Sequence, residues 1–170
     1  MSVIANTTVI SNFAAIGQLE ILRRLFERVY ISVEVYEEIK AGLGEGYDFY
    51  TTVESAVQPI AEQGWIELVT MAGEAELRQF AQSPTKLHRG EASSIAIAKE
   101  RGWLFLSDDA AARQYAQEMN LRISGTLGCL TLAVERKLAT LEQANSWLSK
   151  MIEQGYHSPV SDLAELLTAE

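Results

Sequence analysis

Two short apolar stretches of this chain end abruptly in polar side chains that can bind a cation. The stretch Val3–Ala5 is followed by Asn6, and the stretch Leu104–Ser107 is followed by the acidic pair Asp108 and Asp109. Carboxylate and amide oxygens are the ligands of hard cations such as Mg²⁺ and Mn²⁺, with water completing the coordination shell. Metal ions held in this way activate water and stabilise the leaving oxygen during phosphodiester cleavage. Both strand ends are therefore candidates for that chemistry.

Two glutamates can contribute to the same site. Glu38 flanks the apolar stripe of the helix expected after the second strand, whereas Glu34 and Glu37 of that helix point further towards water. Glu91 opens an alanine-rich helix and lies above its buried face. Glu38 and Glu91 are therefore the inward-facing candidates.

Each acidic candidate also has a purely structural interpretation. Glu91 and Asp109 lie in the first turns of helices, where an acidic side chain is stabilised by the helix dipole. Asp108 can be a helix N-cap, and Glu38 can be one more surface glutamate of a glutamate-rich helix. The residues alone leave the metal-binding and the structural interpretations open.

Short apolar strands alternate with helices along the chain, which predicts βαβ units and a mainly parallel sheet covered on both faces. Five strands are expected, at 3–5, 28–31, 65–69, 104–107 and 121–125. Helices are expected at 8–16, 19–26, 33–42, 73–82, 91–102, 109–119 and about 126–137. A further helix is expected to end at about residue 63. Ligands of such open sheets bind beyond the carboxyl ends of the strands, where the polar residues above lie.

The length of 170 residues predicts a single domain, with a helical C-terminal extension from about residue 141. Thr140 and Gln143 form a capping-box pattern, and Ser158-Pro159 is typical of an N-cap followed by proline at the first helical position. The lone Cys129 is expected to be a buried, inert thiol. There is no signal-peptide pattern and no apolar run near the ~20 residues of a membrane helix, so we expect a soluble cytoplasmic protein.

The net charge of −9, from 14 basic and 23 acidic residues, argues against a general nucleic-acid coat protein, which carries a basic surface. It is compatible with an enzyme that approaches phosphates through a bound metal, or with a surface that meets a basic partner.

The motifs, in their order, resemble those of a PIN domain, the metal-dependent ribonuclease fold of VapC-type toxins. The resemblance is carried by "VIANTTVISNFAAIGQLEILRRLF", "VYISVEVYEEI", "HRGEASSIAIAKERG", "LFLSDDAAAR" and "SGTLGCLTLAVERK". It implies a three-layer α/β/α fold with a central, mainly parallel sheet of about five strands. It also implies an acidic cluster that binds Mg²⁺ or Mn²⁺ and hydrolyses RNA phosphodiester bonds. By position, this cluster consists of Asn6, Glu38, Glu91 and Asp109, with Asp108 beside it and the hydroxyls of Thr8 and Ser107 in support.

The chain departs from the family pattern at Asn6, because PIN domains usually have aspartate there. An asparagine oxygen still coordinates a hard cation but brings no negative charge. Metal should therefore bind more weakly, and the remaining carboxylates should repel one another less in the empty site.

Three basic residues near the acidic candidates can contact a phosphate. His88 and Arg89 precede Glu91, and a solvated loop is the alternative interpretation for both. Arg113 follows Asp109 by one helical turn, where it can hold substrate or simply pair with that aspartate.

Three functional hypotheses follow. The first is a metal-dependent endoribonuclease acting as the toxin of a toxin–antitoxin pair; the resemblance implies a homodimer and a small antitoxin that covers the acidic pocket. The second is a catalytically weakened PIN module that binds RNA or a protein partner. The third is a phosphoacceptor receiver-like domain, which paired aspartates after a strand suggest. Receivers, however, carry that acidic pair after the first strand.

Overall fold

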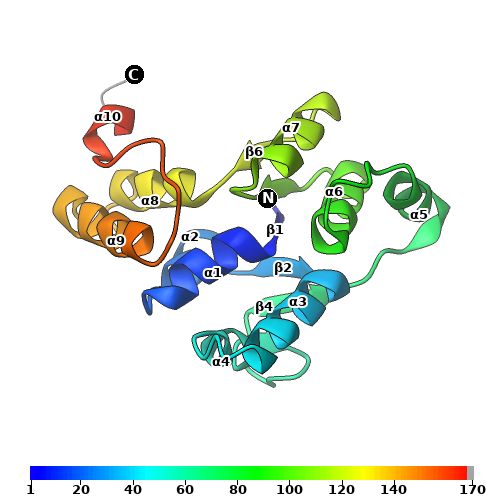
Figure 1. The fold of residues 1–170 in the computed structure, drawn as a ribbon, viewed down its shortest axis with the longest axis horizontal. Coiled ribbons are helices and arrows are strands. Elements are labelled where there is room, and N and C mark those ends of the chain that lie inside the picture. Colours follow the sequence, from blue (N-terminus) through cyan, green and yellow to red (C-terminus); the bar gives the residue numbers. More distant parts are fainter. Residues whose placement is uncertain (168–170) are drawn as a thin grey trace.

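The computed structural model describes residues 1–167 as a parallel six-stranded sheet with helices on both faces (Figure 1). The strand order is β3-β4-β2-β1-β5-β6, and every neighbouring pair is parallel. The strands are β1 (Val3–Ala5), β2 (Val29–Ser32), β3 (Val57–Gln58), β4 (Ile66–Val69), β5 (Leu104–Leu106) and β6 (Ile123–Ser124). The predicted three-layer α/β/α class with a mainly parallel sheet is confirmed.

Ten helices are assigned in the described residues. They are α1 (Thr7–Ala15), α2 (Glu20–Phe26), α3 (Val33–Gly44), α4 (Tyr50–Glu54), α5 (Gly73–Ala81), α6 (Arg89–Arg101), α7 (Ala110–Glu118), α8 (Thr126–Glu135), α9 (Leu141–Glu153) and α10 (Ala164–Leu167). None of those described helices has both the length and the apolar character that a membrane crossing requires.

The strands bury both faces because their side chains alternate between two cores. Ile4 and Phe105 point into one core with apolar residues of α6 and α7. Val3, Ala5 and Leu106 point into the other, with residues of α1, α2, α3, α8 and α9. Cys129 lies in this second core, where burial raises the pKa of its thiol, in agreement with the expected inert cysteine.

The sequence prediction missed one strand and misplaced one helix. The helix expected to reach about residue 63 ends at Glu54, and the chain then forms β3, which pairs with β4. The sheet therefore has six strands rather than about five, because a two-residue strand carries too little periodicity to be distinguished from a helix end.

The pattern Ser158-Pro159 does not begin a helix, so that prediction is wrong. The Ser158 hydroxyl donates to the carbonyl of Val160 at 2.5 Å, which closes a local turn, and the described chain becomes helical again only at Ala164. The capping box Thr140-Gln143 is present as predicted and begins α9.

Helix α5 is held by a charged network in addition to the packing of Phe80 against the core. Glu76 is its one buried residue in the described chain, and Arg101 of α6 donates to it at 2.6 Å. Burial works against the Glu76 carboxylate, but Arg101 and the Ala72 N–H outweigh it and lower the pKa. This network fixes α5 against α6, and α6 in turn carries Glu91.

Candidate functional site

The candidate site lies at the carboxyl edge of the sheet, around the end of its central strand β1. The Asn6 N–H donates to the carbonyl of Leu106 at 3.0 Å, which ties the end of β1 to the end of β5. Helices α1, α3 and α7 begin immediately after β1, β2 and β5, and their N-caps are Asn6, Ser32 and Asp109. Because the strands are parallel, all these helix starts meet at the same edge.

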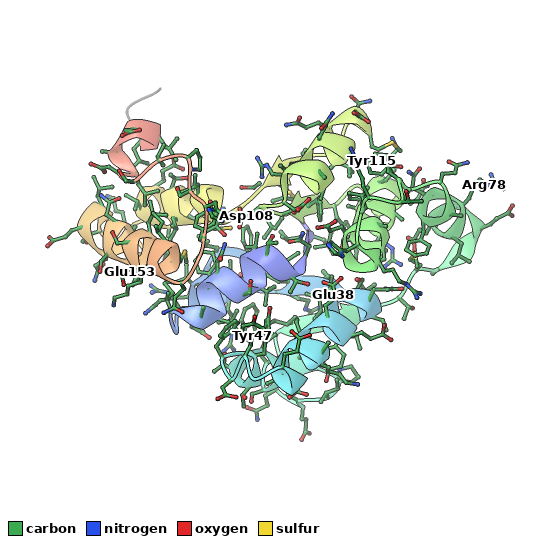
Figure 2. The ribbon with its side chains drawn as sticks, in the orientation of Figure 1. Glu38, Tyr47, Arg78, Asp108, Tyr115 and Glu153 are labelled. Atoms are coloured by element: carbon green, nitrogen blue, oxygen red, sulfur yellow. The ribbon has the colours of Figure 1, made fainter. Side chains whose placement is uncertain are left out.

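A pocket of about 310 Å³ opens at this edge. Its lining consists of Asn6, Thr7, Thr8, Glu38, His88 and Glu91, and we call it the acidic pocket. The structure thus brings together an amide from the end of β1, a carboxylate from α3 and a carboxylate from α6. Figure 2 marks Glu38 on α3, close to the start of α1.

Asn6 is almost fully buried and bonded through both ends of its amide. Its Oδ1 accepts from the Thr8 N–H at 3.1 Å and from the Thr8 hydroxyl at 2.7 Å, which caps α1. Its Nδ2 donates to the Ser107 hydroxyl at 2.7 Å. Asn6 therefore caps α1 through its amide oxygen, and its amide nitrogen has an acceptor of its own. An aspartate at this position would lack that nitrogen.

Glu38 is held by two neighbours in the pocket. Its Oε1 accepts from the Gly90 N–H at 3.2 Å, and its Oε2 accepts from the hydroxyl of Thr7. A Cβ at position 90 would lie 2.6 Å from Oε1 and 3.0 Å from Val35 Cγ2, so Gly90 leaves the space in which the Glu38 carboxylate lies. Thr7 and Gly90 are thus the residues that orient Glu38, and their motif positions gave no sign of that role.

Glu91 is 7% exposed and is bonded to the chain just before its own helix. Its Oε2 accepts from the His88 N–H at 3.0 Å. Burial raises the pKa of the Glu91 carboxyl, and the negative charges of Asp109 and Glu38 raise it further, against the lowering effect of the His88 bond. Three acidic groups from three elements therefore act on one another electrostatically at this edge.

Asp109 is the N-cap of α7. Its Oδ1 accepts from the Ala112 N–H at 2.8 Å, and its own N–H donates to the Ser107 hydroxyl at 3.2 Å. Ser107 therefore joins Asn6 to Asp109, and its supporting role at the site stays a prediction. Among the described residues, no hydrogen bond to Asp109 Oδ2 is found.

Asp108 faces away from the acidic pocket. Its carboxylate accepts from the Thr126 N–H at 2.8 Å, from the Thr126 hydroxyl, and from Asn12 Nδ2 at 3.0 Å. Asn12 Nδ2 also lies 3.1 Å from the Thr126 hydroxyl. We call Asp108, Asn12 and Thr126 the Asp108 junction. It ties the end of β5 to α1 and to the first turn of α8, and neither Asn12 nor Thr126 was a sequence candidate.

The basic candidates take different positions. His88 lines the acidic pocket as the N-cap of α6, and Arg89 is exposed on the first turn of that helix. Arg113 Nη1 donates to the carbonyl of Ser107 at 2.8 Å, and none of the ion pairs between described residues includes Arg113. The expected alternative of an Asp109–Arg113 pair is therefore not formed.

Glu34 differs from its expected orientation towards water. Its Oε2 is shielded from solvent and, within the described chain, has no hydrogen-bond partner. Glu34 precedes Glu38 by one helical turn, but it does not line the acidic pocket. The helical periodicity of α3 therefore placed the Glu34 carboxylate too far outward.

The donor set of the acidic pocket fits a hard divalent cation in kind, since it offers carboxylate and amide oxygens. As the side chains stand in residues 1–167, however, no three Asp, Glu, His or Cys residues form a group that could hold a metal ion. Glu38 is turned onto Thr7 and Gly90, and Asp109 onto its own helix. Joint coordination therefore requires these side chains to rotate.

Comparison with known proteins finds a family match and similar solved structures. The family DUF3368, described as a PIN domain, matches residues 2–169. None of the curated proteins compared with this chain matches it. Among solved structures, a PilT N-terminus domain protein from the hyperthermophilic archaeon Sulfolobus solfataricus P2 is similar, with 12% identity and a TM-score of 0.49. That match covers 93% of this chain and 99% of the archaeal one.

Proposed function

The chain belongs to the PIN-domain family, and from this premise we propose that it is a metal-dependent endoribonuclease of the VapC-like type. PIN domains are typically nucleases, and they generally use divalent metal ions. The observation that carries the proposal is the meeting of Glu38 and Glu91, from two different helices, in one pocket beside the end of β1. The raised pKa of Glu91, caused by burial and by Asp109 and Glu38, supports it, because a bound cation would relieve that crowding of negative charge.

In this proposal Glu38, Glu91 and Asp109 hold Mg²⁺ or Mn²⁺, and Asn6 adds a neutral oxygen. The bound metal supplies an activated water and stabilises charge on the phosphate. Thr7 and Gly90 orient Glu38, while Ser107 orients Asn6 and the start of α7. Asp108, which the sequence placed beside the cluster, supports the site from the neighbouring junction.

A nuclease assay with Mn²⁺ tests the proposal. Wild-type protein should cleave a labelled single-stranded RNA, and Asp109→Asn should lose that activity while keeping the Oδ1 cap of α7. Asp48→Asn, at an exposed loop position, is the matched control and should cleave as wild type does. Equal cleavage by wild type and Asp109→Asn, or none by either protein, contradicts the proposal.

A non-catalytic RNA-binding module is the second candidate. The observation that favours it is the hydrogen bonding of Asn6, whose Oδ1 already accepts twice from Thr8. Under this alternative the wild-type protein binds the same RNA in the presence of Mn²⁺ and leaves it intact.

We further propose that the protein is a homodimer and that a small basic antitoxin covers the acidic pocket. The net charge of −9 supports a basic partner. Light scattering on the purified protein should give twice the monomer mass, and a monomer would contradict the first half of this proposal.

A further inference from the structure

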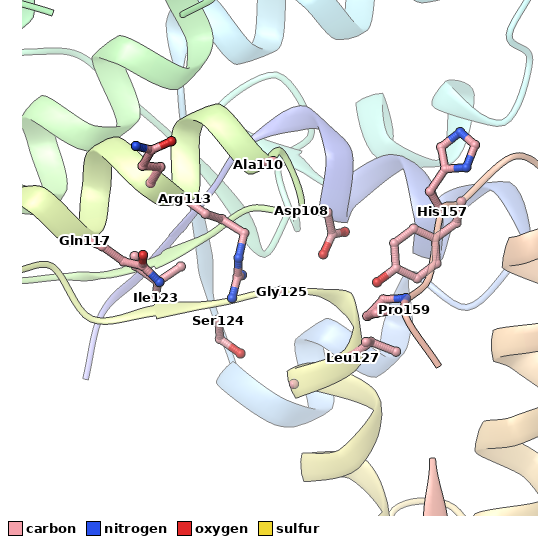
Figure 3. A pocket seen from close by; sticks show the side chains of 13 residues that line it. Asp108, Ala110, Arg113, Gln117, Ile123, Ser124, Gly125, Leu127, His157 and Pro159 are labelled. Carbon is pink, nitrogen blue, oxygen red and sulfur yellow. The ribbon is translucent and has the colours of Figure 1, made fainter. Parts of the chain in front are cut away.

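A groove continues from the acidic pocket across the start of α7. It consists of two hollows of about 290 Å³ and about 550 Å³, which share Asp108, Ala110, Tyr156 and His157. Thr8 lines both the smaller hollow and the acidic pocket, so the three spaces follow one another along the carboxyl edge of the sheet. Figure 3 shows the larger hollow, with Arg113 of α7 on one side and His157 and Pro159 of the C-terminal segment on the other.

The outer wall of this groove is the non-helical segment 155–159, which follows α9. The Tyr156 N–H donates to the carbonyl of Met151 at 3.0 Å, which fixes the near end of the segment. The Leu163 N–H donates to Asn145 Oδ1 at 2.8 Å, and Leu163 is fully buried, which fixes the far end. The wall is therefore anchored on α9 at both ends and is not a loose tail.

The lining offers one cation, Arg113, together with the imidazole of His157 and further hydrogen-bonding groups. Arg113 uses Nη1 to hold the carbonyl of Ser107, and its guanidinium lies beside Gly125, between the end of β6 and the start of α8. His157 is exposed on the opposite wall. Gln117 and Ser124 add an amide and a hydroxyl between them.

Asp108 does not neutralise the guanidinium of Arg113 by forming an ion pair with it in the described residues. Its carboxylate oxygens accept from Thr126 and Asn12, and in the described part of the chain it forms no ion pair with Arg113. A Cβ at Gly125 would lie 2.5 Å from Asp108 Oδ1 and 3.1 Å from Arg113 Nη1. Gly125 therefore leaves room for these two side chains to converge on the start of α8.

We propose that this groove binds the unpaired RNA nucleotides next to the bond that is cleaved, with Arg113 and His157 facing their phosphates and Tyr156 and Gln117 facing a base. The inference rests on the proposed ribonuclease function and adds the path of the substrate. A hollow of this size, closed by helices on one side and by an anchored segment on the other, suits a splayed-out nucleotide. A duplex would present its base edges inside the helix instead. Aromatic stacking and phosphate contacts of this kind tolerate many sequences.

Binding without catalysis tests the groove. The probe is a short fluorescein-labelled single-stranded RNA of mixed sequence, measured by fluorescence anisotropy in EDTA so that no metal-dependent cleavage occurs. Arg113→Gln and His157→Gln should each weaken binding by about three- to tenfold, since each removes one phosphate contact. Arg113→Lys, which keeps the charge, should retain most of the affinity.

Two matched controls separate groove effects from net charge. Arg24→Gln removes an exposed arginine of α2 that lines neither hollow, and it should bind RNA as wild type does. Gln117→Glu adds a negative charge at an exposed groove position and should weaken binding, whereas Gln82→Glu adds the same charge at the end of α5 and should not. Unchanged unfolding temperatures would show that the groove variants still fold.

The results distinguish this inference from the ribonuclease proposal. Wild-type protein that binds RNA through Arg113 and His157 but never cleaves it would contradict the ribonuclease proposal and leave the groove standing. If wild type cleaves RNA but the groove variants and the controls change RNA affinity equally, the groove proposal alone is wrong. A wild type that does not bind the single-stranded probe, or that prefers a hairpin duplex of the same composition, would also overturn it.

Discussion

The acidic pocket and the Asp108 junction lie side by side at the same edge of the sheet, and both are built around acidic side chains. In the pocket, Glu91 is buried among like charges and, within residues 1–167, accepts one hydrogen bond, from the His88 N–H. In the junction, Asp108 accepts from Asn12 and from both the N–H and the hydroxyl of Thr126. A carboxylate whose lone pairs are satisfied by the protein stabilises the fold, whereas one that is crowded and under-bonded is available for a ligand.

The two neighbouring aspartates show the same contrast within one dipeptide. Asp108 points towards α1 and α8, while Asp109 caps α7 and acts electrostatically on Glu91. Successive residues in extended backbone point in opposite directions, so adjacent carboxylates at the end of β5 serve different neighbours. Five substitutions can break or sharpen this comparison.

The largest effect is expected from Glu91→Gln in the acidic pocket. We expect Mn²⁺-dependent RNA cleavage to fall by at least about 100-fold, because a neutral amide replaces a charged metal ligand. Glutamine keeps an oxygen that can accept from the His88 N–H, so the fold should be preserved. Initial cleavage rates and circular dichroism spectra check both parts, and cleavage within a few-fold of wild type would contradict the proposed role.

In the Asp108 junction, Asp108→Asn should mainly change stability. The new amide nitrogen would face Asn12 Nδ2 and Thr126, so we expect the free energy of unfolding to fall by about 1–3 kcal/mol. Asp109→Asn keeps its cap oxygen for Ala112 and should lose less than about 1 kcal/mol. Urea denaturation measures both, and an equal loss in the two variants would remove the distinction between these aspartates.

Adding a carboxylate to the acidic pocket or to the Asp108 junction should have different effects in the two places. Asn6→Asp should bind Mn²⁺ about tenfold more tightly than wild type, because it adds a charged ligand to the acidic pocket. Asn12→Asp adds the same charge beside Asp108, where it should only destabilise the protein. Shifts of the unfolding temperature during Mn²⁺ titration report the affinities. Equal shifts in both variants would mean that the acidic pocket does not bind the metal.

The smallest effect is the pH dependence of stability that Glu91 causes. The folded protein raises the pKa of Glu91 above its ordinary value of 4.5, so the protonated form stabilises the fold. This contribution is fully present below the ordinary value and is lost as the pH rises through the raised one. In EDTA, Glu91→Gln should therefore be more stable than wild type at about pH 7, and the two should converge at about pH 4. A difference in unfolding temperature between wild type and Glu91→Gln that stays constant from about pH 4 to about pH 7 would contradict the raised pKa of Glu91.

Much of the fold could be predicted because the apolar strands and helix caps act locally. The strand at Val3–Ala5 and the box Thr140-Gln143 both appear where the sequence placed them. The prediction missed β3 because two residues give too short a pattern. It was wrong at Ser158-Pro159, where the Ser158 hydroxyl closes a local turn instead of capping a helix. The latter segment is held open by its anchors on α9 and forms the wall of the groove instead.

The residue types and their order along the chain were enough to identify the sheet edge and the acidic side chains that gather there, because parallel strands all end on one side. Which carboxylates meet was settled by contacts between residues about a hundred positions apart, such as Asn6 with Ser107 and Asn12 with Asp108. The orientation of Glu38 depends likewise on Gly90, whose missing side chain leaves space for the Glu38 carboxylate. No local pattern records these pairings, since they arise only when the sheet brings distant strand ends together.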